Sequence, residues 1–134
     1  GDLKVDEHHT VEDTAIVLGE CFAKALGSKK GIERYGFALP MDDAKAEVLL
    51  DFGGRTWLEW GVTLKREYVG DFPTEMARHF FASFCQSGLC NLHISAQGEN
   101  THHILEVFKA FARAVRQAIR QTGGGIPSSK GCLA

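Results

Sequence analysis

Apolar residues recur at helical spacing in three stretches of the chain. The first covers residues 9–26, and the Gly27-Ser28 pair that follows is a common helix end. The second covers residues 73–87, with a proline in the first turn, where its missing N–H breaks no helical hydrogen bond. The third covers residues 101–121 and is followed by three consecutive glycines. The pattern therefore predicts three helices.

Between and before these helices the apolar and polar positions follow the two-residue period of strands. Strands are expected at residues 3–5, 35–39, 46–52, 56–64 and 89–96. Turn signals lie at residues 40–43 and at Gly53-Gly54. Because Gly53-Gly54 joins two predicted strands directly, we expect residues 46–52 and 56–64 to pair as a hairpin.

Strands and helices alternate without the regular order of parallel βαβ units. The interleaving predicts an α+β fold, with helices layered on a mostly antiparallel sheet. The chain of 134 residues has a length typical of one domain, and it contains no low-complexity linker. We therefore expect residues 1–134 to form a single domain.

Composition excludes several classes of protein. Fifteen Lys and Arg against seventeen Asp and Glu give a net charge of −2, which provides no basic surface for nucleic acid. No apolar run approaches the roughly 18 residues that a membrane span requires, and no leader is recognisable, so we expect no membrane partner. The four cysteines form no CxxC pair, and we expect reduced thiols of an intracellular protein: Cys21, Cys85, Cys90 and Cys132.

The motif His-His-x-x-Glu occurs twice, at residues 8–12 and 102–106, which are 94 positions apart. Each copy follows a strand-like segment and an acidic or polar turn and opens a predicted helix. Two copies of one strand-turn-helix unit indicate an internal duplication.

The spacing of this motif suits metal binding. Residues four apart lie on the same face of a helix, so His8 with Glu12, and His102 with Glu106, can each converge on one cation. The adjacent histidine is turned by about 100° and would point to a different ion. Each copy therefore supplies ligands in two directions, as a two-metal site requires.

Imidazole nitrogen and carboxylate oxygen together suit a divalent Mn, Fe, Co, Ni or Zn ion. No cysteine belongs to the set, which disfavours a structural zinc site, and the HExxH pattern of zinc proteases is absent. The alternative is that these histidines only occupy helix starts at the surface. We interpret His93, at a polar position of a predicted strand, as structural.

Six blocks, in order along the chain, resemble the signatures of the imidazoleglycerol-phosphate dehydratase family of histidine biosynthesis. They are residues 6–13, 31–36, 40–42, 54–55, 100–113 and 127–131. The resemblance covers essentially the whole chain. It implies an internally duplicated fold of the ribosomal protein S5 domain 2-like type, and a cytoplasmic protein, or a plastid one if the source is a plant. By the family's pattern the chain is truncated at its N-terminus.

The resemblance also implies a cofactor and its ligands. Family members hold two Mn²⁺ ions per active site, and other first-row divalent metals are compatible with the same donors. The implied ligands are His8, His9, Glu12, His79, His102, His103 and Glu106, of which His79 is assigned by the resemblance alone.

A second implied set binds a phosphorylated imidazole substrate. It consists of Arg34, Arg55, Lys109, Ser128, Ser129 and Lys130. The chemistry is suitable, because guanidinium groups bind phosphate oxygens bidentately and a Ser-Ser-Lys loop offers hydroxyl and ammonium donors.

The implied reaction is the removal of water from imidazole glycerol phosphate to give imidazole acetol phosphate. Glu12 and Glu106 are the expected catalytic carboxylates, and the family places a further carboxylate in an N-terminal segment absent from this chain. Family members form trimers that assemble into 24-subunit shells with active sites between subunits, so a homo-oligomer is expected. The alternative is a metal-dependent assembly module without catalytic activity.

Overall fold

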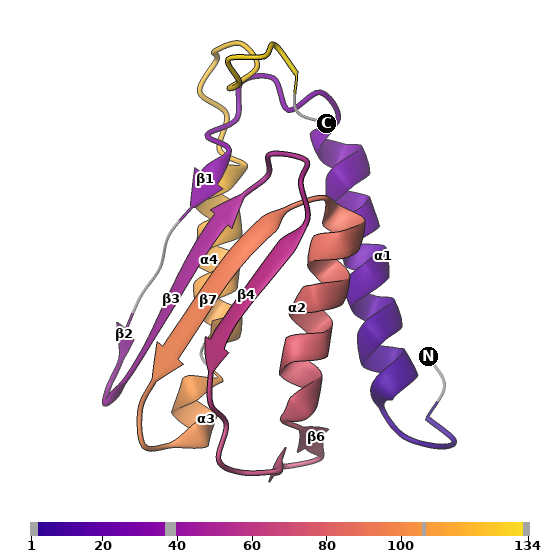
Figure 1. Cartoon of the computed structure of the whole chain (residues 1–134), viewed down its shortest axis with the longest axis vertical. Helices are drawn as coiled ribbons and strands as arrows, with labels where there is room; N and C mark the ends of the chain where they lie inside the picture. The colour runs from indigo at the N-terminus through magenta and orange to yellow at the C-terminus, as the bar shows by residue number, and fades with distance from the viewer. Residues whose placement is uncertain (1–2, 37–39, 106, 133–134) are drawn as a thin grey trace.

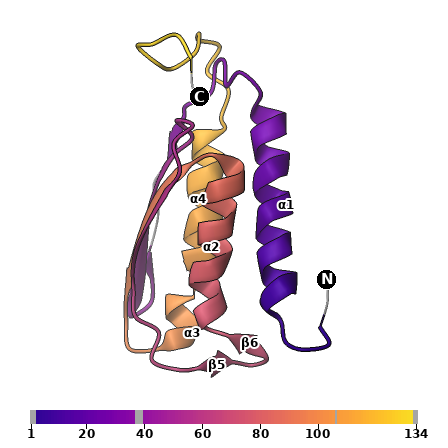
Figure 2. The ribbon, with the colours of Figure 1, turned by 45° about the vertical axis from the view of Figure 1, so that its right-hand side comes forward.

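The computed structural model describes residues 3–36, 40–105 and 107–132, and the side chains of Pro40, Met41 and His103 lie outside this description. Its elements follow one another as α1 (His8–Leu26), β1 (Tyr35–Gly36), β2 (Pro40–Met41), β3 (Ala44–Asp51), β4 (Trp57–Val62), β5 (Tyr68–Val69), β6 (Phe72–Pro73), α2 (Glu75–Gly88), β7 (Asn91–Gln97), α3 (Thr101–Ile104) and α4 (Val107–Ala118). Helices α2 and α4 cover one face of the sheet, and α1 packs on the outer side of α2 (Figures 1 and 2).

The main sheet is mixed, with strand order β1-β3-β7-β4 and with β2 also paired to β3. Every pair is antiparallel except β4 with β7. Alternate residues of β3 and β7 are buried, and Val48 lies opposite Ile94 as Leu50 lies opposite Leu92. This register places the apolar side chains of both strands under the helices, which confirms the predicted α+β fold.

Phenylalanines fill the space between the sheet and the helices. Phe81 of α2 is fully buried, and its ring centroid lies 4.8 Å from that of Phe108 and 5.1 Å from that of Phe111. Phe84 contacts Phe111 at 4.9 Å in an edge-to-face arrangement, the geometry that aromatic pairs prefer. These contacts fix α2 to α4 and set the position of both helices over the sheet.

Helices α1 and α2 approach closely because glycines lie at their contact. A Cβ added to Gly19 would lie 2.0 Å from Ser87 Oγ and 2.7 Å from the backbone nitrogen of Gly88. Both helices begin at the same end of the molecule, the lower end in Figure 1. The close contact lies at the end of α2, and because the two helices run in the same direction the first turn of α1 lies beside the early turns of α2.

The predicted hairpin of β3 and β4 was wrong. Strand β7 lies between them, and β4 pairs with β7 in parallel. The reason is burial. The inward side chains of β7, such as Leu92 and Ile94, are almost completely buried and require neighbours on both sides, whereas the inward residues of β4 are only half-buried and suit an edge.

Other boundaries differ from the predicted ones. Residues 3–5 form no strand, and Leu3 and Val5 are 66% and 88% exposed. The last predicted helix is divided at a turn at Leu105 into α3 and α4. Pro40 and Met41, expected in a turn, belong to β2, and the part of a predicted strand at residues 37–39 lies outside the described residues.

All four cysteines are free in the structure, as the sequence predicts. Among the helices of the described residues, none combines the length and apolarity needed to cross a membrane.

Replacing Gly19 by Ala is expected to destabilise the protein, although Ala favours a helix by about 1 kcal/mol over Gly. The added methyl group collides with α2, and overpacking of this kind costs about 1–3 kcal/mol. Urea unfolding measures the change, with Glu20→Ala at the neighbouring exposed position as the control. Unchanged or increased stability of Gly19→Ala would contradict the close helix contact.

Candidate active site: a histidine cluster and an anion pocket

The first His-His-x-x-Glu motif forms a cluster with α2. His8 Nε2 lies 3.5 Å from Glu12 Oε2, as the four-residue spacing predicts. The ring centroid of His8 lies 5.1 Å from that of His79 and 5.7 Å from that of His9. His79 comes from the second turn of α2, which the close helix contact places beside α1. The structure therefore brings together the four side chains of this half of the predicted set.

Both motifs begin with the same backbone arrangement. The His8 backbone N–H donates to Asp6 Oδ1 at 3.0 Å, and the His102 N–H donates to Asn100 Oδ1 at 2.9 Å. Side-chain oxygens of this type satisfy the free N–H groups of a first helical turn. The two motifs thus share a local fold, which supports the predicted duplication even though residues 3–5 form no strand.

The second motif is less complete in the structure. His102 lies exposed on α3, the side chain of His103 is not described, and Glu106 lies outside the described residues. Within residues 3–36, 40–105 and 107–132, no three His, Cys, Asp or Glu side chains converge closely enough to hold a metal ion. The donor chemistry fits a divalent first-row metal, because His8 and His79 offer nitrogen and Glu12 offers oxygen. The described residues of one chain supply only part of such a site.

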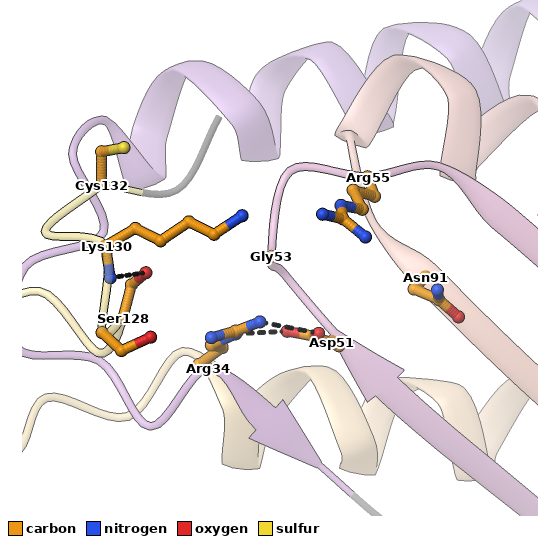
Figure 3. A pocket seen from close by; sticks show the side chains of 9 residues that line it. Arg34, Asp51, Gly53, Arg55, Asn91, Ser128, Lys130 and Cys132 are labelled. Atoms are coloured by element: carbon orange, nitrogen blue, oxygen red, sulfur yellow. Dashed lines mark hydrogen bonds and ion pairs between the residues drawn. The ribbon is translucent and has the colours of Figure 1, made fainter.

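A candidate anion-binding pocket, called the anion pocket below, lies at the opposite end of the sheet, between the end of β3, the loop before β4 and the C-terminal loop (Figure 3). Its volume is about 470 Å³. It is lined by Arg34, Asp51, Gly53, Arg55, Asn91, Ser128, Ser129, Lys130 and Cys132. Five of the six residues predicted to bind the phosphorylated substrate therefore meet here, from three segments that are distant in sequence.

The sixth, Lys109, lies elsewhere. It is exposed on α4, two residues after the start of that helix, and does not line the pocket. In Figure 1 the start of α4 lies at the same end of the molecule as the start of α1. Lys109 therefore belongs with the histidine end of the chain.

Arg34 is held in place by three hydrogen bonds. Its Nε and Nη2 donate to the two carboxylate oxygens of Asp51, the second at 3.0 Å, and its Nη1 donates to the carbonyl of Pro127 at 2.9 Å. The hydrogen bond from Arg34 to Asp51 raises the pKa of the Arg34 guanidinium, which stays charged. One side chain thus connects the end of β3 to the C-terminal loop.

The C-terminal loop folds on itself. The Lys130 N–H donates to Ser128 Oγ at 3.2 Å, and the Gly131 N–H donates to the Ser128 carbonyl at 3.2 Å. In Figure 3 the amine of Lys130 and the guanidinium of Arg55 extend into the same cavity from opposite sides. Cationic donors therefore surround a space that is large enough for a phosphate group.

A buried lysine supports the rim of this pocket. Lys29 is 5% exposed, and its Nζ donates to the carbonyl of Phe52 at 2.8 Å. Burial lowers the pKa of Lys29, and the nearby Arg34 acts in the same direction. Phe52 lies between two lining residues, so Lys29 fixes the chain where β3 ends.

Sequence reasoning missed four lining residues, of which Asp51 is the most informative. Asp51 is the last residue of β3, just before the Gly53-Gly54 turn. The one feature of the sequence that could have indicated it is an acidic residue close to Arg55, which was predicted to bind the substrate. Gly53, Asn91 and Cys132 carried no signal that distinguishes them from ordinary turn, strand and tail residues.

The pocket and the histidine cluster are far apart within one chain. The cluster lies at the start of α1, and Lys29 at the pocket follows the end of this helix. Nineteen residues of α-helix measure about 28 Å. This distance greatly exceeds the length of a three-carbon phosphate ester.

The described residues thus define an α+β chain with a cationic pocket at one end and a helix-borne histidine cluster at the other. Comparison with known families identifies its family. Residues 1–115 match the family imidazoleglycerol-phosphate dehydratase. The chain belongs to this family.

Individual relatives agree with this family assignment. The histidine biosynthesis bifunctional protein HisB of Spirosoma linguale is 56% identical over 137 residues, an alignment that covers 99% of this chain and 36% of the relative. HisB of Bacteroides fragilis is 58% identical over 136 residues, with the same coverage. The chain thus spans little more than a third of these bifunctional relatives.

Solved structures show the same fold. The imidazoleglycerol-phosphate dehydratase of Staphylococcus aureus superposes with a TM-score of 0.83 at 39% identity, covering 87% of this chain and 70% of that one. The Pyrococcus furiosus structure superposes with a TM-score of 0.80 at 30% identity, covering 95% and 72%.

The buried charge of Lys29 gives a pH-dependent stability. The folded-state pKa lies below 10.5, so between that pKa and 10.5 the unfolded chain binds more protons than the folded one. The free energy of unfolding of the wild type should therefore rise with pH in this window, relative to Lys29→Met. Urea unfolding of both proteins in steps above pH 7 measures the difference, and a difference that stays constant or falls with pH would contradict the burial of the charge.

Proposed function

We propose that the protein containing this chain removes water from imidazole glycerol phosphate to give imidazole acetol phosphate. One observation carries the proposal beyond family membership. Arg34, Arg55 and Lys130 come from three separate segments and line one cavity together with Ser128 and Ser129. A pure assembly module has no use for such a convergence.

The pocket's proposed role is to hold the phosphate. Arg55 and Lys130 contribute charge, and Arg34 contributes the N–H groups that its bonds to Asp51 and Pro127 leave available. The hydroxyl groups of Ser128 and Ser129 add neutral donors. Charge-assisted hydrogen bonds of this kind are the strongest that a phosphate finds in a protein.

The histidine end is proposed to hold the metal. The proposed ligands are those of the two motifs and α2, namely His8, His9, Glu12, His79, His102, His103 and Glu106. A bound pair of Mn²⁺ ions would supply Lewis-acid stabilisation of the negative charge that develops on the azole ring when a proton is lost. Glu12 and Glu106 are proposed to act through the metal, and Lys109, on the same end of the chain, is proposed to contact the substrate.

The separation of the two ends leads to a proposal about assembly. A ligand held by the phosphate pocket of one chain cannot reach the histidine cluster of the same chain, which lies about 28 Å away along α1. We infer that the active site combines the pocket of one subunit with the histidines of another, in a symmetric homo-oligomer. The trimer and the 24-subunit shell remain predictions from the resemblance.

Replacing Lys130 by Ala is expected to raise the KM for imidazole glycerol phosphate by about tenfold or more, since a hydrogen bond to a charged group contributes about 1.5–3 kcal/mol. Oligomeric state, measured by native mass, should not change. Lys24→Ala, which removes the same charge from the exposed face of α1, is the control. A KM unaffected by Lys130→Ala would contradict the phosphate role of the pocket, whereas a wild type without dehydratase activity would support the assembly-module alternative.

Mixing two inactive variants tests the shared site. One carries His8→Ala and His9→Ala, and the other carries Arg55→Ala and Lys130→Ala. Random pairing after dissociation and reassembly restores both intact halves at up to about a quarter of the sites. Steady-state rates should rise to a corresponding fraction of the wild type. A mixture no more active than the two variants measured separately would place each site within one chain.

A further inference from the structure

A carboxylate lies among the cations of the anion pocket. Asp51 lines the same cavity as Arg34, Arg55 and Lys130, and its side chain is 29% exposed. A negative charge at this position repels a bound phosphate. A carboxylate at this position is therefore expected to contribute to the site in another way that outweighs this repulsion.

We propose that Asp51 is the positioning residue of the phosphate site, acting through Arg34. The proposal rests on the proposed function in that the ligand is a phosphate ester. An arginine has five N–H donors, and Arg34 directs two of them to Asp51 and one to the Pro127 carbonyl. One N–H on Nη1 and one on Nη2 remain for the ligand. Because Asp51 fixes the plane of the guanidinium, it determines the directions of these two N–H groups.

The backbone around Asp51 is itself held in place, so that the carboxylate can orient the Arg34 guanidinium. The Phe52 N–H donates to the Arg34 carbonyl at 3.2 Å, and Lys29 Nζ donates to the Phe52 carbonyl at 2.8 Å. Arg34 has a φ of +74°, an uncommon backbone conformation for a residue with a side chain. The segment of Arg34 and the end of β3 are therefore held together by backbone and side-chain bonds alike.

Gly53 leaves the space that the pair needs. A Cβ on Gly53 would lie 2.8 Å from Arg34 Nη2 and 3.0 Å from Asp51 Oδ2. Replacing Gly53 by Ala thus displaces the pair without changing any charge. This provides a second way to disturb the same geometry.

The positioning role and a purely electrostatic role predict opposite signs. Asp51→Asn removes a negative charge from an anion site, so electrostatics alone would strengthen phosphate binding. Asn also replaces one acceptor oxygen with an NH₂ donor that faces Arg34, so the bidentate pair is lost. If Asp51 acts by positioning, binding weakens even though the pocket becomes more positive.

The experiment measures inorganic phosphate binding by titration calorimetry and the KM and kcat for imidazole glycerol phosphate. For Asp51→Asn we expect the phosphate Kd and the KM to rise about tenfold, because a hydrogen bond to a charged group is lost. The kcat should change by less than about threefold. Gly53→Ala should change both constants in the same direction. Glu47→Gln, which removes the same charge from an exposed position of the same strand, should change neither.

Tighter or unchanged phosphate binding in Asp51→Asn would overturn the proposal, as would a Gly53→Ala protein that binds phosphate like the wild type. A wild type that binds no phosphate would overturn it as well. If the wild type binds phosphate but does not dehydrate the substrate, the proposed function fails while the role of Asp51 is still decided by the phosphate Kd. The thermal midpoint of each variant separates loss of folding from loss of positioning.

Discussion

The length of α1 is the constraint on which the rest of the account depends. The helix begins in the histidine cluster and ends next to Lys29, which supports the rim of the anion pocket. The close glycine contact between α1 and α2 holds this rigid element against the core, so the two groups of functional side chains cannot approach each other within one chain. Any chemistry that needs both groups therefore has to join one subunit to another.

At the pocket end, the shape of the cavity depends on a few hydrogen bonds between distant segments. Arg34 connects β3 to the C-terminal loop through its hydrogen bonds to Asp51 and Pro127. Lys29 fixes the carbonyl of Phe52, the residue that follows Asp51. Ser128, Ser129 and Lys130 of the loop line the cavity because the loop is attached at this point. The pocket is thus a property of tertiary structure rather than of any one motif.

The sequence predicts what local spacing determines. The start of the third helix at Thr101, the start of the first within one residue of the predicted one, the i to i+4 contact of His8 with Glu12 and the buried alternation of β3 all follow from local patterns. The pairing of β4 with β7 depends on which strand has the most apolar surface to bury, and the short Gly53-Gly54 turn between β3 and β4 does not reveal this. The hairpin prediction was therefore wrong. Asp51 was missed for the same reason, because its role exists only once Arg34 folds against it.

The central claim is that the active site combines the anion pocket of one subunit with the histidine cluster of another, so that only an oligomer can be active. Native mass spectrometry combined with metal analysis and with dehydratase assays of the separated species tests it most directly. The account predicts that dehydratase activity is found only in an oligomer that retains divalent metal. A folded 14.7 kDa monomer that binds no metal and still dehydrates the substrate would contradict it.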